Sequence, residues 1–156
     1  MIRIFNLTFL VFLFLITKAN SLIEIDITRG NLDPLPIAVS PLFQDDNSKK
    51  NSINELKLEN VGSEISSVVE NNLKTSGLFN PLSKEAFLQK PDIAHLKPRF
   101  EDWALIKAQA LITGKVTIEN KKLKVEFRLW DILAGREMMA LAFTTVPSNW
   151  RRVGHI

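Results

Sequence analysis

The clearest periodicity in the chain lies between residues 123 and 130, where apolar side chains alternate with charged ones and a tryptophan. The apolar positions are Leu123, Val125, Phe127 and Leu129. A period of two predicts a strand that buries one face. Turn-forming residues separate it from apolar segments at 108–118 and 138–146. We therefore predict that the last third of the chain is a β-meander whose first strand, apolar on both sides, is central.

The strongest helical pattern lies between residues 61 and 73. Its apolar side chains recur at spacings that place them on one face of a helix. They are Val61, Ile65, Val68, Val69 and Leu73. Asn60 is suited to cap the start of this helix, and Gly77 is suited to the left-handed position after its end.

The segment before this helix predicts one short strand and one loop. Ile37–Val39 is apolar and is expected to be a buried strand, with Pro36 and Pro41 at its ends rather than inside its ladder. Residues 44–54 are polar and rich in turn-forming types, which predicts a solvated loop.

Shorter elements follow the helix. Residues 83–87 are expected to form a single turn capped by Ser83, and a proline-bounded loop holds His95. A short second helix is predicted at 100–106. A last helix opens after a proline, with Ser148 or Asn149 as its N-cap, and we expect it to continue in a longer protein.

The start of the chain has the pattern of a secretory signal peptide. Arg3 precedes an apolar run of ten residues, Leu7–Ile16, which is about half the length that spans a bilayer. Two cleavage sites fit the small-residue rule: one with Thr17 and Ala19 at its key positions, and a preferred one with Ala19 and Ser21. Residues 1–21 would then be removed. A buried amino-terminal element and a retained anchor stay open as alternatives.

The net charge argues against a polyanion-binding protein. The chain has 20 basic and 17 acidic residues, and loss of Arg3 and Lys18 with the leader leaves 18 against 17, or +1. We therefore predict no nucleic-acid partner, even for the basic stretch Trp150–Arg152, and no stable insertion into a membrane. The chain has no cysteine, which excludes disulfides and thiolate chemistry.

The sequence offers no recognisable catalytic or metal-binding motif. His95 and His155 lack partners at ligand spacing, and Asp45–Asn47 lacks the spacing and the glycine of a calcium loop. Nucleophile elbows, phosphate-binding loops and zinc-protease motifs are missing. We therefore predict no enzymatic activity, no catalytic residue, no metal and no cofactor.

The segment that follows the predicted cleavage site alternates like a strand. It consists of Leu22, Ile23, Glu24, Ile25, Asp26, Ile27, Thr28, Arg29, Gly30, Asn31 and Leu32. Such a strand either stays in its own sheet or pairs with another protein by β-augmentation. The residues alone favour a permanently docked first strand.

Several short motifs resemble one family in order and spacing. They are Ile25-Asp26-Ile27 with Gly30, Pro36–Val39 with Pro41, Asn72-Leu73 through Ser76–Leu82, Ile112–Val116 and Asn149–His155. Together they resemble the amino-terminal domain of the TolB family, a component of the Tol–Pal cell-envelope system. The resemblance covers residues 22–156, after a signal peptide at 1–21.

The resemblance implies an α/β fold of the α+β two-layer type, with about two helices packed on a mixed sheet of about five strands. It also implies a periplasmic, non-enzymatic protein that supports outer-membrane integrity and envelope constriction during cell division. A TolA-like inner-membrane protein would be contacted by residues 22–32, which reverses the preference for a docked strand. The family also binds the lipoprotein Pal through a carboxy-terminal β-propeller.

The chain departs from the family in length. Nothing in it can form a propeller, which needs many repeated strands, so Pal is expected as a partner only where a propeller is present elsewhere. Two other interpretations stay open. One is a non-functional fragment of a longer TolB, and the other is a small exported ligand-binding domain.

Overall fold

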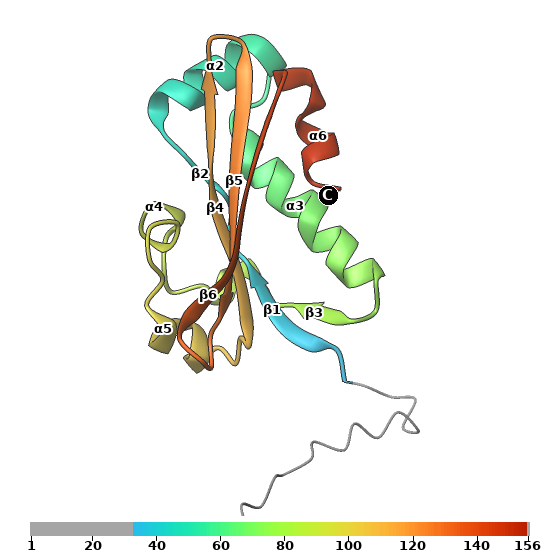
Figure 1. The fold of residues 1–156 in the computed structure, drawn as a ribbon, viewed down its shortest axis with the longest axis vertical. Helices are drawn as coiled ribbons and strands as arrows, with labels where there is room; N and C mark the ends of the chain where they lie inside the picture. Colours follow the sequence, from blue (N-terminus) through green and yellow to red (C-terminus); the bar gives the residue numbers. More distant parts are fainter. Residues whose placement is uncertain (1–32, 156) are drawn as a thin grey trace, which may run out of the picture. The chain divides into compact units, whose positions relative to one another are not determined.

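The computed structural model describes residues 33–155, which contain a mixed sheet of six strands (Figure 1). Its order is β3-β1-β4-β5-β6, with β2 paired to β4 beside this path. The predicted α+β class is confirmed, with five α-helices packed on the sheet among the described residues. The strand predicted at 22–28 lies outside them.

One half of the sheet is parallel. β1 (Leu35–Val39) runs parallel to β3 (Phe79–Pro81) and to β4 (Ala110–Glu119), and β2 (Phe43–Gln44) is also parallel to β4. The central position predicted for β4 is therefore confirmed. Pro36 lies inside β1 rather than at its end, one residue before the register with β4 begins, so its missing N–H interrupts no ladder there.

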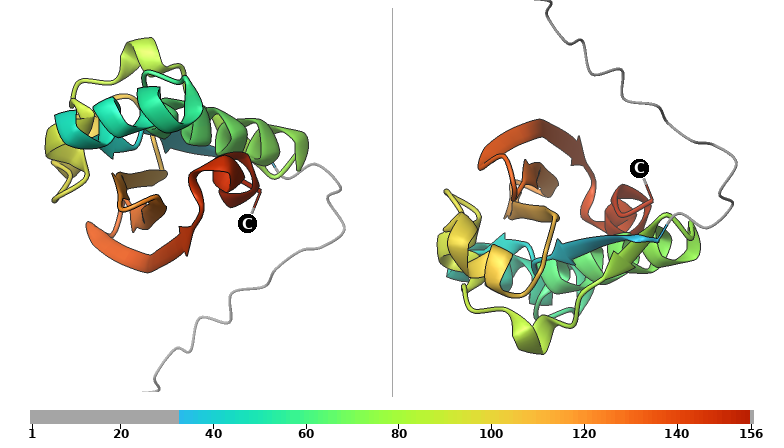
Figure 2. Two further views of the ribbon diagram at one scale, coloured as in Figure 1. Left: turned by 90° about the horizontal axis from the view of Figure 1, so that it is seen from above. Right: turned by 90° about the horizontal axis from the view of Figure 1, so that it is seen from below.

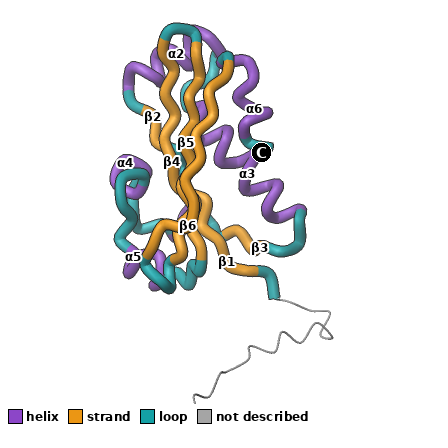
Figure 3. The backbone as a smooth tube through the Cα atoms, viewed as in Figure 1, coloured by secondary structure: helices purple, strands orange, loops and turns teal. Residues whose placement is uncertain are grey.

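The other half is the predicted antiparallel meander. β5 (Lys122–Asp131) pairs along its whole length with β4, and β6 (Arg136–Thr145) pairs with β5 (Figure 3). Asn120 and Lys121 both have positive φ in the β4–β5 turn, which is the backbone that a tight hairpin requires. The β5–β6 register shifts between Leu129 and Trp130, so Met138 is an extra residue on β6.

The prediction of a solvated loop at residues 44–54 is wrong, because most of this segment belongs to the helix α2 (Asp46–Leu56). Asp45 caps this helix by accepting a hydrogen bond from the Ser48 backbone N–H at 2.8 Å. Ser48 and Ser52 are buried one turn apart, and the Ser48 hydroxyl accepts from the Ile118 N–H of β4 at 3.1 Å. The buried face of α2 is thus made of serines, which an apolar-periodicity search does not detect.

The predicted main helix is confirmed as α3 (Val61–Thr75), with Asn60 accepting from the Ser63 N–H at 3.0 Å. Gly77 has the expected positive φ of 72° just after the helix. The predicted apolar face is the one that packs on the sheet, since Val61 and Ile65 are fully buried.

Two short helices follow on the other face of the sheet. α4 (Pro91–Ala94) replaces part of the loop predicted around His95, because Pro91 starts a helical turn without losing a needed N–H. α5 (Phe100–Leu105) is the predicted second short helix, and the turn near residue 83 is a 3₁₀ helix, Lys84–Ala86.

The end of the described chain packs on α3. A 3₁₀ turn, Pro147–Asn149, leads into α6 (Trp150–Val153). Asn149 does not cap it through its side chain, which donates to the Thr145 hydroxyl instead. A side chain at Gly154 would lie 2.8 Å from Val68, so glycine permits this close approach of α6 to α3.

Two hydrophobic clusters lie on opposite faces of the sheet. The first joins β4 and β5 to α3 and α6, and it consists of Leu42, Val61, Ile65, Val116, Ile118, Leu123, Val125 and Val153. The second packs β1, β4 and β5 against α4 and α5, and it consists of Ala38, Ala94, Trp103, Ala108, Leu111, Trp130 and Ile132. β6 supplies no fully buried residue to either cluster, although its partly buried Phe143 packs against the first, and Figure 2 shows β6 on the far side of β4 and β5 from α3.

Candidate protein-binding surface

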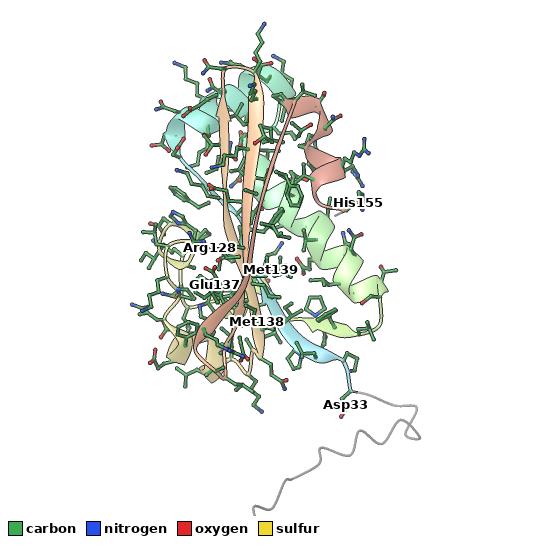
Figure 4. All side chains as sticks on the ribbon, in the orientation of Figure 1. Asp33, Arg128, Glu137, Met138, Met139 and His155 are labelled. Carbon is green, nitrogen blue, oxygen red and sulfur yellow. The ribbon has the colours of Figure 1, made fainter. Side chains whose placement is uncertain are left out.

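The predicted TolA-contacting segment, residues 22–32, and the predicted cleavage residues Ala19 and Ser21 lie outside the described part of the chain. The described residues begin at Asp33, two residues before β1 begins at Leu35 (Figure 4). β1, the strand that follows this segment in the sequence, pairs with the edge strand β3.

β6 presents exposed apolar side chains along one strand. Met138, Met139 and Leu141 are 58%, 51% and 45% exposed. Figure 4 labels the two methionines on β6. Within residues 33–155, no strand pairs with the side of β6 that faces away from β5. β6 is therefore an open edge strand, which presents unpaired backbone N–H and C=O groups together with apolar side chains.

One face of the β5–β6 hairpin forms the wall of an apolar groove. β6 contributes Met139, Leu141 and Phe143, which lie opposite Leu129, Phe127 and Val125 of β5. Val69 of α3 and Val153 of α6 form the other wall, and the groove has a volume of about 200 Å³. Arg128 is its one charged lining residue. The groove offers apolar contact and few polar groups that could orient a small ligand.

The other face of the hairpin carries ion pairs. Lys124 contacts Glu126 at 2.8 Å along β5, and Arg128 of β5 contacts Glu137 of β6 at 3.7 Å. These side chains are all well exposed, so the pairs contribute little to stability. Between them β6 presents the small side chains of Ala140 and Ala142, opposite Arg128 and Glu126.

The two histidines have structural contacts. His95 stacks on Phe43 with ring centroids 4.3 Å apart, and this contact joins α4 to β2. His155 Nδ1 lies 3.1 Å from Asn72 Nδ2, which also donates to the Gly154 carbonyl at 2.9 Å. The described residues hold no group of three or more His, Cys, Asp or Glu side chains that could bind a metal ion.

The carboxyl of Asp45, at the start of α2, has a lowered pKa. Hydrogen bonds from the backbone and side chain of Ser48 lower the pKa of this carboxyl below its ordinary value, with a smaller contribution from the nearby charges of Lys115 and Lys49. Burial acts in the opposite direction. The shift is that of an N-cap, whose negative charge is stabilised by the helix start.

The exposure of β6 was not predicted from the sequence. The run Met138–Phe143 is uninterrupted and apolar, a pattern typical of a strand buried on both faces. The available signal was its place in the chain, because the last strand of a meander has only one neighbour unless another segment covers it.

No helix in residues 33–155 has the length and apolar character needed to cross a membrane.

Two of the motifs that carry the resemblance contact each other, since the Asn72 side-chain amide donates a hydrogen bond to the Gly154 carbonyl. A third motif holds Thr113, whose hydroxyl accepts from the Trp130 indole N–H at 2.8 Å. These motif residues are therefore part of the framework of the fold.

Comparison with known proteins decides the family. A model of the TolB amino-terminal domain matches residues 23–138. The chain belongs to the TolB amino-terminal domain family. A curated relative, the Tol–Pal system protein TolB of Pelagibacter ubique (strain HTCC1062), is 72% identical over 148 residues. That match covers 95% of this chain and 33% of the relative, so the chain spans about a third of the length of this TolB.

Solved structures confirm the TolB-like fold. TolB from Acinetobacter baumannii is similar with a TM-score of 0.59 at 18% identity, over 80% of this chain and 26% of that chain. The lipoprotein GNA1162 from Neisseria meningitidis has a TM-score of 0.52 at 17% identity, over 72% of this chain and 81% of that chain. At these identities the likeness concerns the fold alone.

Proposed function

We propose that this chain is a non-enzymatic, periplasmic protein-binding module of the Tol–Pal system, and that its mature amino-terminal segment, residues 22–32, contacts a TolA-like inner-membrane protein. The observation that carries the proposal is the 72% identity to a Tol–Pal system protein TolB. The signal-peptide pattern of residues 1–21 supports export to the periplasm.

The chemistry of the segment supports a strand-pairing role. Ile23, Ile25 and Ile27 alternate with Glu24, Asp26 and Thr28, so a strand formed by these residues has one apolar and one polar side. Pairing of this strand with a sheet edge of the partner supplies backbone hydrogen bonds, and the isoleucines supply specificity.

Similarity to a Tol–Pal system protein also supports a proposal about the wider role. We propose that the module supports outer-membrane integrity and envelope constriction during cell division. Contact with Pal is proposed only for a protein that also carries a β-propeller, because the chain spans about a third of its curated relative.

Calorimetric titration of the mature chain, residues 22–156, with the soluble domain of TolA tests the proposal. Deletion of residues 22–32 should abolish binding and leave the circular-dichroism spectrum nearly unchanged. Ile25→Lys should weaken binding strongly, whereas Glu24→Gln, on the polar side of the strand, serves as its matched control. Undiminished binding after the deletion would contradict the proposed contact. A non-cooperative melt of the mature chain would favour a non-functional fragment instead.

A further inference from the structure

We propose that Met138 and Met139 form an oxidation site on β6: peroxide converts both side chains to sulfoxides, and the sulfoxide of Met139 makes the apolar groove polar while the fold stays intact. The inference goes beyond the proposed TolA contact and does not depend on residues 22–32. It rests on the distribution of sulfur in the chain, on the exposure of the two side chains and on the lining of the groove.

The sulfur of the mature chain is confined to one place. The sequence has three methionines and no cysteine, and Met1 belongs to the predicted leader. Residues 22–156 therefore carry sulfur only at Met138 and Met139, which are adjacent on β6. An oxidant that is selective for sulfur thus reacts with the mature chain at these two positions and leaves the other side chains unchanged.

Both methionines are open to a small oxidant. Each is more than half exposed, in contrast to the fully buried leucine at position 123 of the neighbouring strand. Because the sulfur lies near the end of a flexible side chain, peroxide reaches it without unfolding of the sheet. The new oxygen stays in contact with water at such a position, so no unsatisfied polar group is buried and the fold is retained.

The reaction is a transfer of one oxygen atom to each thioether. The sulfur lone pair attacks one oxygen of hydrogen peroxide, so that an S–O bond forms as the O–O bond breaks. The departing hydroxide takes the proton of the transferred hydroxyl and leaves as water. The sulfur is oxidised by two electrons and the peroxide is reduced. Methionine sulfoxide reductases reverse this modification, which makes it suitable for a switch.

Met139 connects the reaction to the groove. It lies opposite Leu129 of β5 and contributes to a wall of apolar side chains, in which Arg128 is the one charged lining residue. A sulfoxide places a polar oxygen on this wall, and an apolar ligand must remove water from that oxygen in order to bind. Met138 is absent from the described residues that line the groove, so its oxidation serves as an internal comparison.

Mass spectrometry of the mature chain, residues 22–156, tests the site. Dilute hydrogen peroxide should add one oxygen atom at Met138 and one at Met139. A control variant with Met138→Leu, Met139→Leu and Leu123→Met moves the sulfur to a fully buried position and keeps similar side-chain volumes. Its oxidation should be about tenfold slower or more, and thermal melting verifies that it folds. Equal rates at the exposed and the buried positions would overturn the proposal.

Binding of the neutral apolar dye N-phenylnaphthylamine, followed by its fluorescence, supplies the second readout. The unoxidised chain should bind the dye, and peroxide should weaken binding about tenfold while the thermal melt stays cooperative. Met139→Leu should bind the dye and lose the response to peroxide, whereas Met138→Leu should keep the response. Failure of the unoxidised chain to bind the dye, a response that persists in Met139→Leu, or unfolding on oxidation would overturn the proposal.

Discussion

The two edge strands of the sheet, β3 and β6, differ in length and in composition. β3 is three residues long and contains Pro81, whereas β6 is ten residues long and is uncharged from Met138 onward. The Leu82 N–H donates to the Ile37 carbonyl at 2.9 Å, so the nitrogen of the preceding Pro81 points away from β1. Proline thus removes a donor where a further strand would need one.

This difference separates a closed edge from an open one. The closed edge, β3, lies beside β1. The open edge lies at the end of the meander, beside an apolar groove. The fold therefore offers a second surface for strand pairing that is distinct from the amino-terminal segment.

The largest expected effect comes from comparing the same Leu→Ala substitution at a buried and at a half-exposed position. Leu123 of β5 is fully buried and Leu141 of β6 is 45% exposed. Leu123→Ala should lower the free energy of unfolding by about 3 kcal/mol, because it leaves a cavity in the core. Leu141→Ala should cost less than about 1 kcal/mol, because the side chain is already half in water. Urea unfolding at low protein concentration measures both, and equal losses would show that β6 is covered.

A smaller loss of unfolding free energy is expected between β4 and β5, the paired strands that lie between the two edges of the sheet. Trp130 donates its indole N–H to the buried Thr113 hydroxyl at 2.8 Å. Trp130→Phe keeps much of the ring packing and removes this donor, so it should cost about 1–3 kcal/mol. The double variant with Thr113→Val should recover part of that loss, since both polar groups are then gone. Additive losses would argue against the bond.

β2 pairs with the part of β4 that lies beyond β1, and α2 packs there as well. The N-cap of α2, Asp45, is sensitive to acid. The Ser48 hydrogen bonds lower the pKa of Asp45 in the folded chain, so the unfolded chain takes up a proton at higher pH. The stabilisation is therefore present above the ordinary carboxyl pKa of 3.8 and is lost as the pH falls through the lower folded value. Asp45→Asn keeps a capping side chain and should flatten this acid loss slightly. Melting temperatures between neutral and acidic pH measure it.

The smallest effect on folding is expected at the closed edge. Pro81→Val restores an outward N–H on β3 and should change the free energy of unfolding by no more than about 0.5 kcal/mol. It should instead add weak self-association at the β3 edge, which sedimentation velocity detects. If association is unchanged, the shortness of β3 rather than its proline closes that edge.

The sequence was informative where periodicity and burial agree. The β5 alternation and the α3 stripe predicted their elements because apolar side chains mark one buried face. α2 was missed because its buried residues are Ser48 and Ser52, small polar side chains that a search for apolar periodicity does not detect. The exposure of β6 was missed because an apolar run indicates burial and does not show which segment covers it.

The candidate sites were predictable to different degrees. Residues 22–32 stand out by their alternation alone, and their role rests on the family. The groove could not be predicted, because it joins Val69, Phe127, Leu141 and Val153 from four separate elements. Motif residues such as Asn72 and Gly154 identified the family, and their contacts explain their types in physical terms.

Amide hydrogen exchange of the mature chain tests the contrast between the open edge and the interior of the sheet most directly. The account predicts fast exchange for the alternate amides of β6 that face away from β5, and slow exchange for the amides of β4, which is paired on both sides. Protection of β6 equal to that of β4 along its whole length would contradict it.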